Sequence, residues 1–269
     1  MLYETMHVAV PTVFDQKEDV NMEATNAHIK SLQKKGVRSV LISGSTGEQH
    51  SLSVGERLEM MESISESAIH QMEVLFGIAA VRLKDAEKLA AKASETNLSG
   101  VMIGFPPYIR PSQDEAVAYA KRLIERCQKP VILYNNPGRT GFDLSSESAI
   151  TLAQNENVIG IKDLGGPEKI QAVQNGFDRE FSFYAGGEEG LAEKIRFGYN
   201  RLSSIAGNVY PVEIKQWLQQ LLANETPDAS EQKDIERMMK TVYSKNPIIR
   251  VKHELKLGSC RPPLGMSSD

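Results

Sequence analysis

Lys162 is the residue of this sequence whose type and position point most directly to chemistry. It follows the short apolar run Val158-Ile159-Gly160-Ile161, which is typical of a buried strand. Alternation along a strand predicts that Val158, Gly160 and Lys162 share one face, with space beside the amine at Gly160. Burial lowers the pKa of a lysine, and a neutral amine forms a Schiff base with a carbonyl compound. The alternative is a lysine that marks the strand end and extends its ammonium to solvent.

Two further side chains with suitable chemistry lie in and just after the apolar run 131–136. Tyr134 has the strand parity of Ile132 and can therefore point into the same space as Lys162, where a phenol can relay protons to a carbinolamine or enamine. Arg139 follows in the next loop and offers a planar fork to a substrate carboxylate. Taken singly, each residue is explained equally well as a packed tyrosine or a solvated arginine.

Two loops that follow predicted strands carry other candidates. The turn Ser43-Gly44-Ser45-Thr46-Gly47-Glu48 places two hydroxyls between glycines, and consecutive N–H groups in such a turn can bind a carboxylate. The loop 105–113 contains three prolines and can present Tyr108 to a site in its own chain or in a neighbour. Each loop also has an ordinary explanation as a turn, the second with Ser112 as the N-cap of a helix.

These candidates lie within a regular alternation of strands and helices. The predicted strands cover residues 6–13, 37–43, 73–79, 100–105, 131–136, 158–163, 181–185 and 202–206. The predicted helices cover residues 22–34, 54–67, 84–95, 113–128, 146–154, 167–176, 189–197 and 212–222.

Eight strand–helix units in residues 6–222 predict a closed (β/α)8 TIM barrel, because such strands pair in parallel through right-handed crossovers. The active site of such a barrel lies at the carboxyl ends of its strands. An open doubly wound sheet is the alternative. The first strand lacks a following Gly-x-Gly-x-x-Gly motif, which weighs against a dinucleotide-binding version.

The chain changes character after residue 222. A polar, proline-containing turn at 224–230 precedes helical stretches at 231–243 and 247–257 and an irregular tail at 261–269. We therefore expect a barrel domain of residues 1–222 and a C-terminal helical extension with a tail, residues 223–269.

Composition excludes several functional classes. The chain has 31 basic and 35 acidic side chains and a net charge of −4 without a large block of one sign, so neither nucleic acid nor an anionic membrane is an expected partner. Residues 1–16 lack the apolar core of a signal peptide. The five histidines and two cysteines, Cys127 and Cys260, fit no metal-ligand spacing. We expect a cytoplasmic protein with reduced thiols and no metal.

Considered together, these segments resemble the dihydrodipicolinate synthase / N-acetylneuraminate lyase family of Schiff-base (β/α)8 lyases, from about residue 7 to residue 264. Their order and spacing carry the resemblance. The segments are Gly44-Ser45-Thr46-Gly47-Glu48, Pro107-Tyr108-Ile109-Arg110-Pro111, Tyr134-Asn135-Asn136-Pro137, Gly160-Ile161-Lys162 and Asn246-Pro247.

The resemblance implies a catalytic role for four residues. Lys162 forms the imine with pyruvate or another 2-oxo acid. Tyr134, Ser45 and Tyr108 form a proton relay, to which Tyr108 is contributed across a dimer interface. The family is usually a tetramer of tight dimers and needs no metal or organic cofactor, so we expect a homodimer or homotetramer without a cofactor.

The same resemblance implies the binding residues. Thr46 binds the 2-oxo acid carboxylate together with Ser45, and Gly186 and Ser203 contact substrate through backbone carbonyls. Arg139 is similar to the arginine with which the synthase branch binds aspartate semialdehyde. The expected reaction is therefore the condensation of pyruvate with that aldehyde, as in 4-hydroxy-tetrahydrodipicolinate synthase. The alternatives are a 2-keto-3-deoxy sugar-acid aldolase or another pyruvate aldolase of the family, and a non-catalytic barrel that binds a 2-oxo acid.

Overall fold

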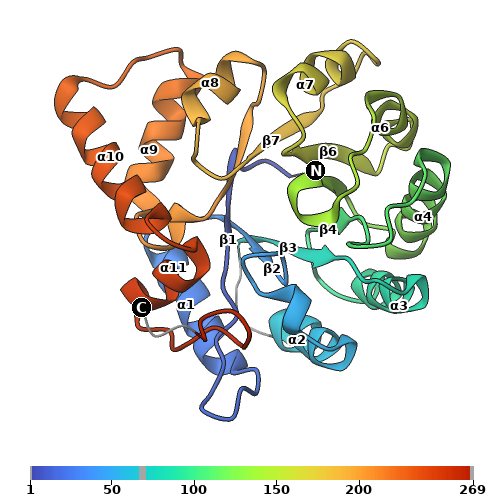
Figure 1. Cartoon of the computed structure of the whole chain (residues 1–269), viewed down its shortest axis with the longest axis horizontal. Helices are drawn as coiled ribbons and strands as arrows, with labels where there is room; N and C mark the ends of the chain where they lie inside the picture. The colour runs from blue at the N-terminus through green and yellow to red at the C-terminus, as the bar shows by residue number, and fades with distance from the viewer. Residues whose placement is uncertain (1, 67–70, 267–269) are drawn as a thin grey trace.

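Eight parallel strands close into a barrel in the computed structural model, which describes residues 2–66 and 71–266 (Figure 1). The barrel closes where β8 pairs in parallel with β1. The predicted closed barrel is therefore confirmed, and the open doubly wound sheet is excluded. The strands are β1 (Met6–Ala9), β2 (Ser39–Ile42), β3 (Glu73–Ile78), β4 (Gly100–Gly104), β5 (Val131–Asn135), β6 (Val158–Asp163), β7 (Ser182–Gly186) and β8 (Arg201–Ser204).

Helices surround the strands, and three short helical elements lie in the loops (Figure 1). The outer helices are α1 (Met22–Lys34), α2 (Val54–Glu66), α3 (Leu83–Ser94), α4 (Gln113–Cys127), α6 (Ser146–Ala153), α7 (Pro167–Gln174), α8 (Leu191–Arg196) and α9 (Pro211–Leu222). The loops contain η1 (Gln49–Ser51), α5 (Pro137–Thr140) and η2 (Ala206–Asn208). The last residue of the predicted helix 54–67 lies outside the described residues.

Local sequence explains several of these helix starts. Ser112 caps α4 through a reciprocal capping box with Glu115, as its position before the helix suggests. Asn21 caps α1 by accepting a hydrogen bond from the amide of Ala24. Proline opens α7 and α9, where its missing N–H costs no helical hydrogen bond.

Two observed strands end at least two residues before their predicted ends. β1 ends at Ala9 rather than at residue 13, because Pro11 has no N–H to continue the ladder and the chain turns. β8 ends at Ser204 rather than at residue 206, because the chain winds into η2. The chain therefore leaves the sheet at the carboxyl ends of β1 and β8 earlier than predicted.

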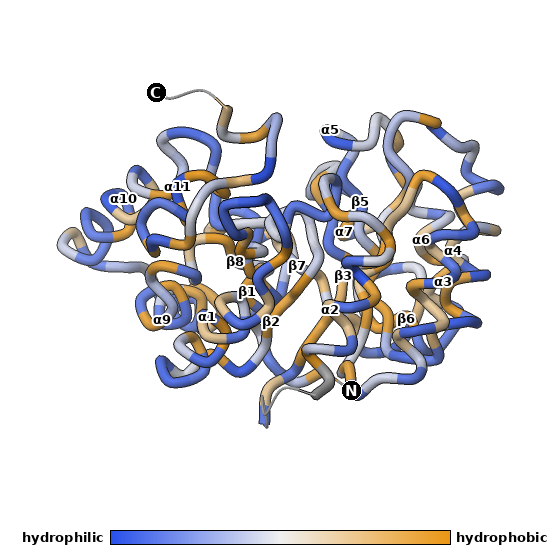
Figure 2. The backbone as a smooth tube through the Cα atoms, turned by 90° about the horizontal axis from the view of Figure 1, so that it is seen from below, coloured by the Kyte–Doolittle hydropathy of each residue, from blue (hydrophilic) through white to orange (hydrophobic). Residues whose placement is uncertain are grey.

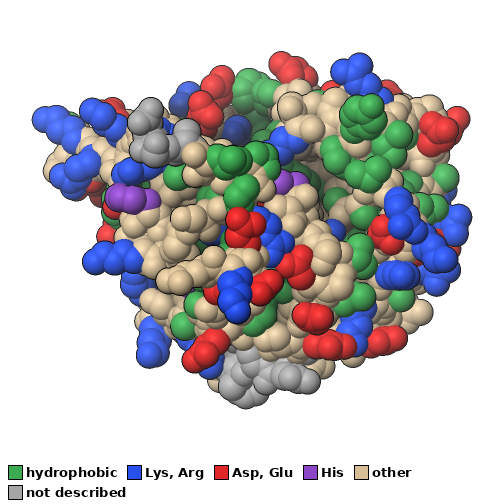
Figure 3. Space-filling view, turned by 60° about the horizontal axis from the view of Figure 1, so that its bottom comes forward, with side chains coloured by type: hydrophobic (Ala, Val, Ile, Leu, Met, Phe, Trp, Pro, Cys, Tyr) green, Lys and Arg blue, Asp and Glu red, His purple; other side chains and the backbone are tan. Residues whose placement is uncertain are grey.

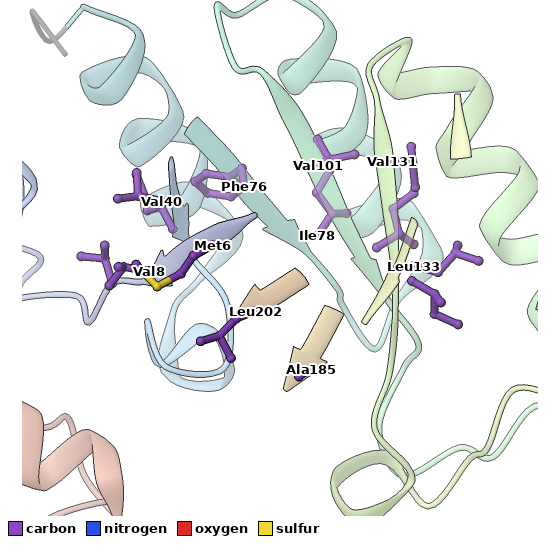
Figure 4. Close-up of a cluster of buried hydrophobic side chains, with 14 of the residues drawn as sticks. Met6, Val8, Val40, Phe76, Ile78, Val101, Val131, Leu133, Ala185 and Leu202 are labelled. Carbon is purple, nitrogen blue, oxygen red and sulfur yellow. The ribbon is translucent and has the colours of Figure 1, made fainter. Parts of the chain in front are cut away.

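The strand alternation builds two apolar layers. The barrel interior contains one cluster that Leu2 joins from the N-terminal segment: Leu2, Ala9, Leu41, Leu75, Met102, Ile132 and Tyr184. Side chains of opposite parity, such as Val8, Val40 and Phe76, point outward and pack in the larger cluster between strands and helices (Figure 4).

One parity prediction is wrong. Val158 belongs to the outer cluster and not to the face of Lys162. The cause is a shift in the β5–β6 register, where Val131 pairs with Val158 but Ile132 pairs with Gly160. The space at Gly160 is also not free, since a Cβ there would lie 2.6 Å from the carbonyl oxygen of Ser182.

The C-terminal extension packs beside the barrel. It contains α10 (Ala229–Tyr243) and α11 (Pro247–Leu255), which lie on the same side of the molecule as α9 and α1 (Figure 1). Ile235, Met238 and Val242 of α10 join the outer apolar cluster of the barrel. The expected boundary between residues 222 and 223 coincides with the end of α9, and the division into two domains stays a prediction.

The two ends of the barrel differ. α5 and the C-terminal segment lie on one face, and the N-terminus lies on the opposite face (Figure 2).

Basic and acidic side chains are mixed over the face shown in Figure 3. Within the described part of the chain, no helix has the length and apolar character needed to cross a membrane.

Candidate active site

Lys162 extends from β6 into a cavity at the carboxyl end of the barrel. Its neighbours in the sheet are Tyr134 on β5 and Tyr184 on β7. The Nζ atom donates a hydrogen bond to Ser203 Oγ at 2.9 Å and lies 4.9 Å from the ring centroid of Tyr134. The lysine is thus half-buried and held by a hydroxyl rather than by a carboxylate.

The surroundings of Lys162 favour its neutral amine. Burial lowers the pKa of Lys162 below its ordinary value; Tyr134 and Glu188 oppose this effect, and the nearby charges of Arg139 and Lys194 add to it. A larger fraction of the amine is therefore unprotonated near neutral pH than in an exposed lysine. This is the state that attacks a carbonyl carbon.

Tyr134 is the second titratable group of the cavity. Its hydroxyl accepts a hydrogen bond from Asn136 Nδ2 at 2.7 Å and lies 3.4 Å from Ser45 Oγ. Burial by itself raises the pKa of Tyr134, but the charge of Lys162, the hydrogen bonds with Ser45 and Asn136, and the charge of Arg139 together lower it. A phenol with a lowered pKa gives up its proton more readily, which suits a proton relay.

The loop after β2 forms the wall of the cavity opposite Lys162. Ser45 and Thr46 line this wall together with Gly44 and Gln49. The loop approaches β3 closely because Gly77 has no side chain, and a Cβ there would lie 2.3 Å from the carbonyl oxygen of Ser43. The predicted glycine turn therefore depends on a third glycine, on the neighbouring strand.

Backbone hydrogen bonds close this loop into a compact turn. The amide of Glu48 donates to the carbonyl of Ser45 and the amide of Gln49 donates to the carbonyl of Gly44, each at 3.2 Å. Thr12, after β1, donates its hydroxyl to the carbonyl of Gly47 at 2.7 Å. The cavity wall is thereby fixed to both neighbouring strands of the barrel.

Ser203 and Gly186 lie at the ends of β8 and β7. Ser203 is fully buried and accepts the hydrogen bond of Lys162 with its side chain, while its carbonyl accepts from the amide of Gly187 at 3.1 Å. Gly186 lies against the side chain of Leu164 and does not line the cavity of Lys162. The structure therefore brings Ser203, but not Gly186, to the amine.

Arg139 and Tyr108 lie farther out. Arg139 is exposed on the short helix α5, from which its charge acts on both Lys162 and Tyr134. Tyr108 is 92% exposed, with a positive φ of 79°, and its backbone amide donates to the carbonyl of Thr140 at 3.3 Å. Within one chain, Tyr108 is therefore held near α5 and away from the cavity.

Three residues of the site were not predicted from the sequence. Asn136 contacts the Tyr134 hydroxyl. Its position two residues after Tyr134, which gives it the same strand parity, was the sequence signal that could have predicted this contact. His7 lies inside the barrel against Tyr184, where burial and the charge of Lys162 hold its pKa well below the usual value. Glu188, buried after β7, accepts hydrogen bonds from the hydroxyls of Ser204 and Tyr243.

Among residues 2–66 and 71–266, no three His, Cys, Asp or Glu side chains group closely enough to hold an ion. The chemistry that these side chains can supply is nucleophilic attack by an amine with proton transfer by a phenol.

A (β/α)8 barrel with a desolvated lysine on β6 and a tyrosine beside it on β5 defines a class of imine-forming barrel. The model of the dihydrodipicolinate synthetase family matches residues 3–269. The chain belongs to this family.

Relatives of the chain are similar over nearly its whole length. The 4-hydroxy-tetrahydrodipicolinate synthase of Bacillus subtilis is 30% identical over 98% of this chain and 94% of its own length. A crystal structure of dihydrodipicolinate synthase from Acinetobacter baumannii, chloride inhibited and complexed with pyruvate, has a TM-score of 0.86 at 25% identity and covers 98% of this chain and 93% of its own. A sialic acid aldolase of Ruminococcus gnavus shares the fold, with a TM-score of 0.89 at 21% identity over 98% of this chain and 91% of its own.

Proposed function

We propose that this chain is a Schiff-base lyase that condenses pyruvate with aspartate semialdehyde, the reaction of a 4-hydroxy-tetrahydrodipicolinate synthase. The observation that carries the proposal is the half-buried amine of Lys162, with its lowered pKa, 4.9 Å from the ring of Tyr134. The similarity to synthases named above and to the pyruvate complex of one of them supports the choice of substrates.

In the proposed reaction, the neutral amine of Lys162 attacks the keto carbon of pyruvate, and a proton moves to the oxygen to give a carbinolamine. Loss of water from the carbinolamine forms the imine. Removal of a methyl proton then gives an enamine, whose carbon attacks the aldehyde. Tyr134 delivers and accepts these protons, with Ser45 next in the relay at 3.4 Å from its hydroxyl.

We assign the carboxylate of pyruvate to the turn of Ser45 and Thr46, because both residues line the cavity that contains the amine. Ser203 holds the amine before attack through the 2.9 Å hydrogen bond. Gly186 and the carbonyl of Ser203 remain proposed substrate contacts for a conformation in which Leu164 has moved. Arg139 is the proposed partner of the aldehyde carboxylate, which an exposed guanidinium on α5 can bind bidentately.

We further propose that two copies of the chain share each site. In this proposal Tyr108, which is exposed beside α5, enters the site of a neighbouring copy and completes the relay of Tyr134 and Ser45. A homodimer or a tetramer of such dimers provides this contact. The two buried free thiols, Cys127 and Cys260, suit the reducing cytoplasm, where we place the reaction.

A substrate panel tests the reaction. Purified protein should consume pyruvate only when aspartate semialdehyde is present, and Lys162→Ala should abolish this turnover. Cleavage of sugar-derived 2-oxo acids without turnover of aspartate semialdehyde would instead establish an aldolase of the same family. Pyruvate binding by calorimetry without imine or turnover would identify a non-catalytic barrel.

A further inference from the structure

The loop that carries Ser45 and Thr46 is bound to the C-terminal segment of the chain through one buried carboxylate. Glu48, the residue that closes this loop, is fully buried. Its Oε1 atom forms an ion pair with Lys252 of α11, whose side chain is only 1% exposed, and its Oε2 atom accepts the backbone amide of Arg261 at 2.8 Å. These partners lie more than two hundred residues away along the chain.

The ion pair between Glu48 and Lys252 is enclosed by other residues of the chain. Lys252 Nζ also donates to the carbonyl of Ser259 at 3.0 Å and lies 4.4 Å from the ring centroid of Phe14. A buried carboxylate whose partner is removed becomes an uncompensated charge, so Glu48 and Lys252 require one another. The pair thereby fixes the position of α11 relative to the loop after β2.

Arg261 closes the contact from the outside. Its guanidinium lies 4.4 Å from the ring centroid of Phe14 and donates to the carbonyl of Ser51, the last residue of η1, at 2.7 Å. It also pairs with Glu56 on α2 at 2.6 Å. Arg261 thus contacts the chain that follows Glu48 at two points, on η1 and on α2.

Glu48 is connected to the candidate site by the backbone. Its amide donates to the carbonyl of Ser45 at 3.2 Å, and its own φ of 57° lies in the left-handed region that non-glycine residues rarely adopt. Such a conformation persists only where surrounding contacts hold it. The ion pair with Lys252 and the amide of Arg261 are contacts of this kind.

We propose that Glu48, Lys252 and Arg261 are positioning residues, which hold the β2 loop so that Ser45 and Thr46 face the amine of Lys162 and bind the 2-oxo acid carboxylate. The inference rests on the proposed function. The C-terminal segment thus determines how tightly the site binds pyruvate, although none of the three residues touches it.

The experiment measures the pyruvate concentration that gives half-maximal borohydride trapping at Lys162. Arg261→Ala and Lys252→Met should raise it by about tenfold, which corresponds to a loss of about 1.4 kcal/mol in binding. Trapping at saturating pyruvate should stay near the wild-type level, because the lost interaction holds the bound ligand rather than the reacting bond. The matched control is Arg237→Ala, which removes an arginine that is 76% exposed on α10.

Cysteine alkylation reports whether the segment has opened. Cys260, next to Arg261, is 7% exposed and should become labelled in both variants, while Cys127 in the core should remain protected. Arg261→Ala keeps the inference testable if Lys252→Met does not fold, because it leaves the buried ion pair intact.

Three outcomes separate the possibilities. A lower melting temperature and labelling of Cys260 with an unchanged half-saturating concentration would overturn the inference, since a purely structural contact predicts that result. An equal shift in Arg237→Ala would overturn it as well. No adduct in the wild-type protein would instead refute the proposed function on which the inference rests.

Discussion

At the scale of single residues, the site combines an amine and a phenol whose pKa values are both lowered. Strand parity was sufficient to place Tyr134 beside Lys162, because both belong to neighbouring parallel strands. The contact between Lys162 and Ser203 could not be predicted in the same way. It depends on how the barrel closes, which brings β8 within reach of a side chain from β6.

The pH dependence of imine formation follows from Lys162. Because burial lowers its pKa below the ordinary 10.5, the rate of trapping at limiting pyruvate should rise with pH through an apparent pKa lower than 10.5. Borohydride trapping across a pH series measures this value. An apparent pKa at or above 10.5 would show that the amine is not desolvated.

The same shift has a consequence for stability. Lys162 is harder to protonate in the folded state than in the unfolded state, so its charge destabilises the fold below the folded pKa, and this cost disappears as the pH rises toward 10.5. Lys162→Met should therefore be more stable than wild type at neutral pH, with a difference that shrinks in alkali. Denaturant titrations at several pH values measure it, and a destabilised variant at neutral pH would contradict the account.

Tyr134→Phe removes the phenol from the cavity. We expect kcat to fall by about 10²–10⁴-fold, the usual contribution of a proton-transfer group, while the protein stays folded. Steady-state kinetics with pyruvate and aspartate semialdehyde provide the measurement. Tyr3→Phe, the same change at a tyrosine that is 77% exposed, is the control, and equal kinetics in the two variants would exclude Tyr134 from the relay.

At the scale of elements, the strand and helix order was predictable, whereas the ends of β1 and β8 were not. Apolar residues continue past both strands, but Pro11 and the turn of η2 stop the ladders. The shift in register near Val158 likewise leaves no sign in the alternating pattern. Such features depend on pairing between strands, which a single strand sequence does not contain.

Gly77 on β3 allows the loop after β2 to approach this strand closely, and the site depends on this approach. Gly77→Ala should displace the backbone of Ser43, cost about 1–3 kcal/mol of stability through overpacking, and weaken pyruvate binding at the adjoining loop. Thermal unfolding and trapping measure the two effects. Gly55→Ala on α2 is the control, because its nearest neighbouring atom would be 3.8 Å away, and it should be neutral or slightly stabilising. Equal behaviour of both variants would refute the role of the close approach.

At the scale of the whole molecule, Tyr108 is a predicted site residue that the fold of one chain leaves exposed. The sequence resemblance suggested its role across an interface, but the fold of one chain leaves the phenol away from Lys162. The fold of one chain forms the barrel and most of the cavity. The proposed relay also needs Tyr108 from a second copy.

Subunit mixing tests the shared site. Lys162→Ala and Tyr108→Phe should each be impaired alone, but a mixed dimer has one site with an intact Lys162 and an intact Tyr108 from the other subunit. Mixing after reversible dissociation should therefore restore turnover above the sum of the two variants. Turnover that stays additive, or a fully active monomer in sedimentation, would contradict a shared site.

The most direct test of the central claim is borohydride reduction of the protein in the presence of pyruvate, followed by peptide mass spectrometry. The account predicts a single reduced pyruvate adduct on Lys162 and none in Lys162→Ala. An adduct on other lysines only, or full turnover without any adduct on Lys162, would contradict the claim that this amine forms the imine.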